Sequence, residues 1–177
     1  MQVEDSTVIP GLRRIEPSVF RDERGGFVEI WNAGDYAFTR EDGSPIAFVE
    51  DDFSVSRRHV LRGLHGDDRT WKLVQCVQGS VHLVVADLRR DSEAYLHWEQ
   101  FELSAAGPLQ VLIPAGCATG LVALEDPSAL LYKQSERYRG AEGQFTVRWN
   151  DPALGIEWPV QEPVLSDRDA QAPDLEP

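Results

Sequence analysis

The chain has 177 residues, of which 42% are hydrophobic, and this is enough apolar material for one well-packed domain but not for two. Its 30 acidic residues against 17 basic ones give a formal net charge of −13, which argues against a nucleic-acid-binding protein because phosphate contacts need a basic face. The sequence has no apolar run of 18 residues and no secretory signal, so we expect a single cytoplasmic domain over residues 1–177 with no membrane contact.

Short apolar segments of strand length, separated by turn residues, follow one another along the chain. Residues 60–73 are typical of a strand, a short turn and the start of a second strand. Further strands are expected at 71–79, 80–88, 96–103, 109–116, 120–124 and 129–134. Helical signals are confined to 34–40 and a turn at 140–143, and the proline-rich segment 150–177 suits an ordered arm around the body. The pattern predicts an all-β sandwich or barrel.

The two cysteines lie in apolar segments and indicate no redox or metal site. Cys76 and Cys117 lack the Cys-x-x-Cys spacing of a zinc or redox motif. We expect both to be buried, reduced thiols, as is usual for cytoplasmic proteins.

His65 lies between Arg62 and Lys72 in an otherwise apolar frame. A neutral histidine inside a barrel, with an acidic partner to hold its tautomer, is a suitable general base near neutral pH. The alternative is a core histidine whose two nitrogens are both satisfied. The residue alone does not decide between them.

Several strings, taken in order, resemble the dTDP-4-dehydrorhamnose 3,5-epimerase-like family of nucleotide-sugar epimerases. They are FRDERGGFVEIW, VLRGLH, KLVQCVQGSV, ADLRR, LYKQSERY, RWNDPALGIEWP and LSDRDAQAP, and they cover nearly the whole chain. The resemblance implies a cupin-type jelly-roll barrel with a few short helices, and usually a homodimer that shares strands. It also implies a nucleotide-diphosphate-linked 4-keto sugar as substrate, with no cofactor and no metal.

The reaction that the resemblance implies inverts a carbon next to a ketone through an enolate. Such an inversion needs a base on one face, an acid on the other, and positive charge near the developing oxyanion. By resemblance, His65 removes the proton and Asp169 orients its imidazole. Tyr132 returns a proton from the opposite face, and Lys72 lies close to the enolate oxygen.

Binding residues also follow from the resemblance. Arg24 and Glu29 match a segment that contacts the substrate in the family. Arg62 matches a diphosphate-binding arginine, and Arg168 would be a second anion contact. Tyr138 matches the aromatic residue that stacks on the nucleobase.

Four positions in the expected binding site depart from the family pattern. Thr119 replaces a histidine in PAGCATGL, Glu50 and Asp52 replace glutamine and asparagine, and Gln144 replaces glutamate. The turn after His65 is also shorter. A carboxylate only accepts hydrogen bonds where an amide can donate as well, so we expect a substrate that differs from dTDP-4-keto-6-deoxyglucose in its sugar, its nucleotide or both. Guanine, with its donor edge, is one base that Glu50 and Asp52 could select.

Three alternatives remain open at this stage. A sugar 3,4-ketoisomerase shares the fold, but that subgroup typically has a second histidine where this chain has Asp67. A metal-dependent cupin oxygenase needs a cluster of histidines and a carboxylate, and Thr119 occupies the expected position of one ligand. A non-catalytic sugar-binding jelly roll is the third.

Overall fold

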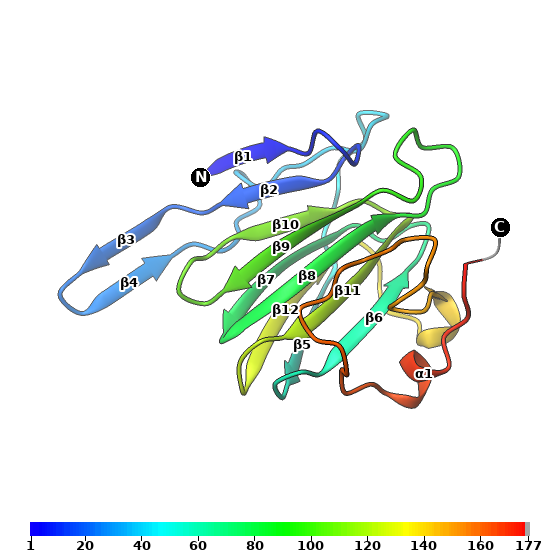
Figure 1. The fold of residues 1–177 in the computed structure, drawn as a ribbon. Coiled ribbons are helices and arrows are strands. Elements are labelled where there is room, and N and C mark those ends of the chain that lie inside the picture. Colours follow the sequence, from blue (N-terminus) through cyan, green and yellow to red (C-terminus); the bar gives the residue numbers. More distant parts are fainter. Residues whose placement is uncertain (176–177) are drawn as a thin grey trace.

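The computed structural model describes residues 1–175, and strands make up most of its regular structure (Figure 1). A six-stranded sheet has the order β1 (Gln2–Asp5), β2 (Arg13–Glu16), β10 (Gln110–Ile113), β7 (Lys72–Gln78), β12 (Ser128–Gln134), β5 (Glu50–Ser56). A five-stranded sheet has the order β13 (Phe145–Thr146), β6 (Leu61–Gly66), β11 (Cys117–Ala123), β8 (Ser80–Asp87), β9 (Trp98–Ser104). These two antiparallel sheets face each other and confirm the predicted all-β jelly roll.

Three smaller elements complete the fold. Strands β3 (Val19–Asp22) and β4 (Gly25–Val28) form a separate hairpin that projects from the body, at the end opposite helix α1 (Asp167–Ala170) (Figure 1). A 3-10 turn, η1 (Ala141–Gly143), agrees with the turn expected at 140–143.

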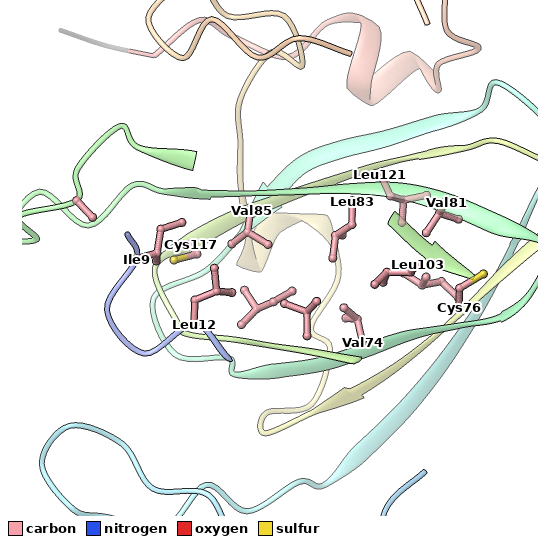
Figure 2. Packing of buried hydrophobic residues seen from close by; sticks show 14 residues of the cluster. Ile9, Leu12, Val74, Cys76, Val81, Leu83, Val85, Leu103, Cys117 and Leu121 are labelled. Atoms are coloured by element: carbon pink, nitrogen blue, oxygen red, sulfur yellow. The ribbon is translucent and has the colours of Figure 1, made fainter. Parts of the chain in front are cut away.

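Apolar side chains fill the space between the two sheets (Figure 2). Leu83 and Val85 from β8 meet Val74 of β7, as expected when alternate residues of facing strands point inward. Cys76 and Cys117 belong to the same core and are free thiols, as predicted. This core occupies one part of the sandwich and leaves the other part for polar side chains.

The outer face of the five-stranded sheet is covered by residues 147–158. Leu154, Ile156 and Trp158 pack over Val84 and Ala86 of β8. Within this cover, Arg148 donates its backbone N–H to the carbonyl of Pro173, which connects it to the C-terminal segment. Helix α1 lies between these two residues in the sequence and contacts β6 near His65.

The prediction of a helix at 34–40 is wrong, because this segment contains a turn and no helix. The Asn32 side chain accepts hydrogen bonds from the N–H groups of Gly34 and Asp35, which closes a local turn in place of a helical ladder. Tyr36 and Phe38 then pack with Ile46 in a second apolar cluster that includes Leu112 of β10. Tertiary burial therefore overrides the weak local helix signal.

Gly63 produces a bulge in β6 that places the side chains of Arg62 and His65 on the same face of the sheet. His65 pairs with Thr119 and Arg62 pairs with Leu121, so three steps along β6 oppose two steps along β11. Without the extra residue, positions 62 and 65 would point to opposite faces of the sheet. Gly63 has φ +129°, and a Cβ there would lie 2.6 Å from both Gly120 Cα and Thr119 O.

Replacing Gly63 by alanine is therefore expected to lower the free energy of unfolding by about 2 to 4 kcal/mol, because both the backbone conformation and the contact with β11 oppose a side chain. Urea denaturation measures this change. Gly107→Ala is the matched control, since the nearest atom to its added Cβ is Ser104 Oγ at 3.7 Å. A loss of stability no larger than that of the control would contradict the role given to Gly63.

Candidate active site

A cavity of about 460 Å³ opens between the two sheets, next to the apolar core. Val74, Leu83 and Leu121 belong both to the core and to the cavity wall. The polar lining consists of Asp52, Ser54, Arg62, His65, Lys72, Thr119, Tyr132, Gln134, Tyr138, Gln144, Ser166, Arg168 and Asp169. The volume falls within the range of small-molecule sites.

His65 and Asp169 form a hydrogen-bonded pair in this cavity, although 104 positions separate them in the sequence. The distance from His65 Nε2 to Asp169 Oδ1 is 2.6 Å, with Asp169 almost fully buried. Asp169 is fixed at α1 by Ser166, whose hydroxyl donates to Asp169 Oδ2 over 2.9 Å. With the proton on Nε2, Nδ1 of His65 carries the lone pair that can accept a proton.

The environment keeps Asp169 ionised. Burial alone would raise its pKa, but the hydrogen bond and charge of His65, together with the Ser166 hydroxyl and Arg168, lower the pKa below its ordinary value. An ionised Asp169 stabilises the imidazolium that forms when His65 takes a proton.

Lys72 lines the same cavity from β7 and is 94% buried, with 6% of its surface exposed. Burial lowers the pKa of its ammonium group. In its ammonium form, with little solvent around it, Lys72 would interact strongly with an oxygen that gains negative charge.

Tyr132 enters the cavity from β12 of the six-stranded sheet, whereas His65 enters from β6 of the five-stranded sheet. Burial raises the pKa of the Tyr132 phenol, so this group is protonated at neutral pH and can donate. A flat substrate between the two sheets would thus have the imidazole on one side and the phenol on the other.

Two arginines supply positive charge. Arg168 of α1 is held by Thr146, whose Oγ1 accepts from Nη2 over 2.6 Å, and by Gln144, whose Oε1 accepts from Nη1 over 3.3 Å. Arg62 donates from Nε to Ser56 Oγ over 2.9 Å. Both guanidinium groups line the cavity and retain further donors for an anion.

A carboxylate pair lies along β5, on the same wall as Tyr132. The Gln134 amide donates to Asp52 Oδ2 and to Glu50 Oε1. Glu50 Oε1 also accepts from the backbone N–H of Tyr138 over 2.8 Å, and Tyr138 is 53% exposed. Asp52 lines the cavity itself. Glu50 does not, but it holds Gln134 and Tyr138 of the cavity wall by hydrogen bonds.

Two predicted binding residues lie elsewhere. Arg24 is in the β3–β4 hairpin, where it pairs with Asp22, and Glu29 follows β4 and accepts from Asn32. Neither lines the cavity between the sheets. Thr119 does line it, but its hydroxyl donates to the backbone carbonyl of His65 over 3.2 Å.

The sequence reasoning missed three polar residues of the cavity, namely Ser54, Gln134 and Ser166. Ser54 alternates with Asp52 along β5, so the period of two that places Asp52 inside also places Ser54 inside. Ser166 precedes the short Asp-Arg-Asp helix, and a serine in that position is a typical N-cap.

Within residues 1–175, no group of three His, Cys, Asp or Glu side chains is arranged to hold a metal ion. In the same range, no helix has the length and apolar character required to cross a membrane.

A jelly roll whose cavity joins an Asp-paired histidine, a buried lysine and a facing tyrosine defines a sugar epimerase of the cupin type. The family model of dTDP-4-dehydrorhamnose 3,5-epimerase matches residues 6–177. The chain belongs to this family and is an isomerase of the carbohydrate epimerase class.

Individual relatives agree with this assignment. A dTDP-4-dehydrorhamnose 3,5-epimerase from Salmonella typhimurium is 41% identical over 180 residues, which cover 99% of this chain and 97% of the relative. The solved dTDP-4-dehydrorhamnose 3,5-epimerase of Bacillus anthracis, with TDP and PPi bound, has a TM-score of 0.90 and 35% identity, covering 98% and 99% of the two chains. A 3'-monoepimerase from Streptomyces bikiniensis, in complex with dTDP-quinovose, has a TM-score of 0.87 and 31% identity, covering 97% and 87%.

Proposed function

We propose that this epimerase inverts C3, C5 or both in a nucleotide-diphosphate-linked 4-keto sugar, in the cytoplasm, as a step of deoxysugar biosynthesis. The observation that carries the proposal is the placement of His65 and Tyr132 on opposite sheets around one cavity. His65 removes the proton next to the ketone, Lys72 stabilises the enolate oxygen, and Tyr132 protonates the other face. The free thiols Cys76 and Cys117 suit a reducing compartment.

Product analysis tests this proposal. The protein is incubated with dTDP-, GDP- and CDP-linked 4-keto-6-deoxy sugars, and proton NMR coupling constants report the configuration at C3 and C5. Inversion with the ketone still at C4 supports the proposal. A ketone moved to C3 would instead establish a 3,4-ketoisomerase, and binding without conversion of any sugar would establish a non-catalytic module.

The number of inverted carbons depends on more than these residues. The relatives include both a 3,5-epimerase and a 3'-monoepimerase with closely similar folds. One base and one acid can serve either outcome, because the outcome depends on which ring carbon reaches His65. We therefore propose inversion at C3, C5 or both, and the product assay examines the configuration of each carbon.

A dTDP-linked sugar is the first substrate to test. Two of the relatives described above are dTDP-4-dehydrorhamnose 3,5-epimerases and the third is in complex with dTDP-quinovose, so none of the three supports a substrate outside the dTDP-sugars. The expectation of a different substrate remains a prediction. Among the departures behind it, Asp52 places a second carboxylate, besides that of Asp169, in a cavity that also holds two arginines. The pKa of Asp52 is raised, first by burial and then by the charge of Glu50, so its negative charge costs more here than on a carboxyl group in water.

Asp52→Asn is expected to tighten the binding of dTDP by about three- to tenfold, because a partly solvent-screened negative charge leaves an anion-binding cavity. Titration calorimetry with dTDP and GDP measures this. If Asp52 instead accepts from guanine, the same substitution weakens GDP binding, which identifies a purine-linked substrate.

The effect of Asp52→Asn on folding stability follows from the raised pKa of Asp52. Because the folded pKa of Asp52 lies above its unfolded value, its effect on stability becomes unfavourable as pH rises through that interval and stays so at pH 7. The variant should therefore be at least as stable as the wild type at pH 7. Asp51→Asn is the matched control, since Asp51 pairs with Lys133 outside the cavity; equal changes in dTDP affinity for both variants would contradict a local effect.

We also propose that the active form is a homodimer in which the β3–β4 hairpin completes the site of the second copy. This hairpin projects from the body (Figure 1). On it, Phe20 and Phe27 are 65% and 69% exposed and line the same shallow site as Arg24. Light scattering should give twice the mass of the chain. Mixing subunits of Arg24→Ala with subunits of His65→Asn should restore up to about a quarter of the activity if each site uses residues of both copies, whereas a monomer, or no restoration, would contradict the proposal.

A further inference from the structure

The hydroxyl of Tyr132 has a hydrogen-bond partner that has no role in the reaction proposed above. Ser54 Oγ donates to Tyr132 Oη over 3.3 Å. The two residues lie diagonally across the β5–β12 pair, since Ser54 is opposite Leu130 and Tyr132 is opposite Asp52. Both side chains line the cavity. Within residues 1–175, the structure shows no other hydrogen bond to the Tyr132 hydroxyl.

The surroundings of Tyr132 make the hydrogen bond from Ser54 important for the proposed role of Tyr132 as an acid. Burial raises the pKa of the phenol, and the nearby Asp52 charge raises it further. The Ser54 hydrogen bond and the Arg62 charge act in the opposite direction. A phenol that gives up its proton in such a place leaves an anion with little solvent, and a hydrogen-bond donor to that anion is then worth more than one to the neutral phenol.

We propose that Ser54 is a positioning residue for Tyr132, an inference that rests on the proposed epimerase function. In the reprotonation step, the Tyr132 O–H bond breaks and a C–H bond forms at the enolate carbon, so the negative charge moves from the enolate to the phenolate. The Ser54 hydroxyl keeps its own proton and donates to that phenolate. Before the step, the same bond occupies a lone pair of Tyr132 Oη and leaves its O–H free to donate into the cavity.

The catalytic test compares two rates in Ser54→Ala. The His65-dependent exchange of substrate protons in D₂O should stay within about twofold of wild type, whereas formation of inverted product falls about tenfold with KM unchanged. Ser54→Thr keeps the hydroxyl on a β-branched residue that suits a strand, and should restore product formation. Equal losses of exchange and inversion, or no loss of either, would overturn the role of Ser54.

A double variant separates action through Tyr132 from direct action on the substrate. In a Tyr132→Phe background, Ser54→Ala should cause no further loss of product formation, because the partner hydroxyl is already absent. A tenfold loss in both backgrounds would show that Ser54 acts independently of Tyr132 and would refute the inference while leaving the epimerase function intact.

A spectroscopic measurement gives an independent readout without substrate. The chain has four tyrosines, so labelling their ring Cζ carbons gives few NMR signals, and Tyr132→Phe identifies the one from Tyr132. Ser54→Ala should shift that signal and Ser54→Thr should not. An unmoved signal would show that the hydrogen bond is absent in solution and would overturn the inference. A wild-type protein that converts no sugar would instead refute the proposed function.

Discussion

His65→Asn is expected to abolish the exchange of substrate protons with solvent, reducing its rate by about a thousandfold, while dTDP binds nearly as well as to the wild type. General bases contribute about 10²- to 10⁴-fold, and asparagine can occupy the site without accepting the proton. His65 has 21% side-chain exposure and bonds to Asp169 over 2.6 Å, a position that suits the proposed role in proton transfer. Proton NMR in D₂O follows the exchange, and calorimetry follows binding.

His59→Asn is the matched control for this prediction. His59 lies in the turn between β5 and β6 with φ +67°, a conformation that asparagine tolerates. The control variant should exchange protons at the wild-type rate. Exchange in His65→Asn at a rate close to that of the control would show that another group is the base.

Tyr132→Phe is expected to separate the two halves of the reaction. Formation of inverted product should fall by about a hundredfold, because the acid on the second face is missing. Proton removal by His65 should fall much less, since the base lies on the other sheet. The ratio of deuterium exchange to product formation, measured by NMR in one sample, is therefore predicted to rise.

Tyr95→Phe provides the control, because Tyr95 stacks near Arg90 and does not line the cavity. It should leave both rates unchanged. If Tyr132→Phe lost exchange and inversion by the same factor, Tyr132 would not act as a separate acid, and its role would be in binding or in forming the cavity.

Much of the sheet structure could be predicted from the sequence, because alternating apolar residues and turn signals are local. The segments expected at 71–79 and 80–88 correspond to β7 and β8. Residues 34–40 failed as a helix because Tyr36 and Phe38 are buried by a distant sheet, which no local signal reveals.

The site shows the same division between local and long-range information. The pairing of His65 with Asp169 spans 104 positions, so the resemblance suggested it and the geometry then placed the two atoms in contact. The bulge at Gly63 depends on a close approach of β11, a long-range contact that cannot be predicted from the sequence RGLH. Ser54 was overlooked because a serine between Phe53 and Val55, in a segment not assigned as a strand, carries no signal until the strand is known.

Solvent deuterium incorporation tests whether His65 and Tyr132 invert a carbon next to the ketone through an enolate. The wild-type protein is incubated with dTDP-4-keto-6-deoxyglucose in D₂O, and mass spectrometry and proton NMR locate the label. We expect deuterium at C3, C5 or both, with inverted configuration at each labelled carbon. Inverted product without deuterium would contradict an enolate mechanism with solvent-exchanging groups on both faces.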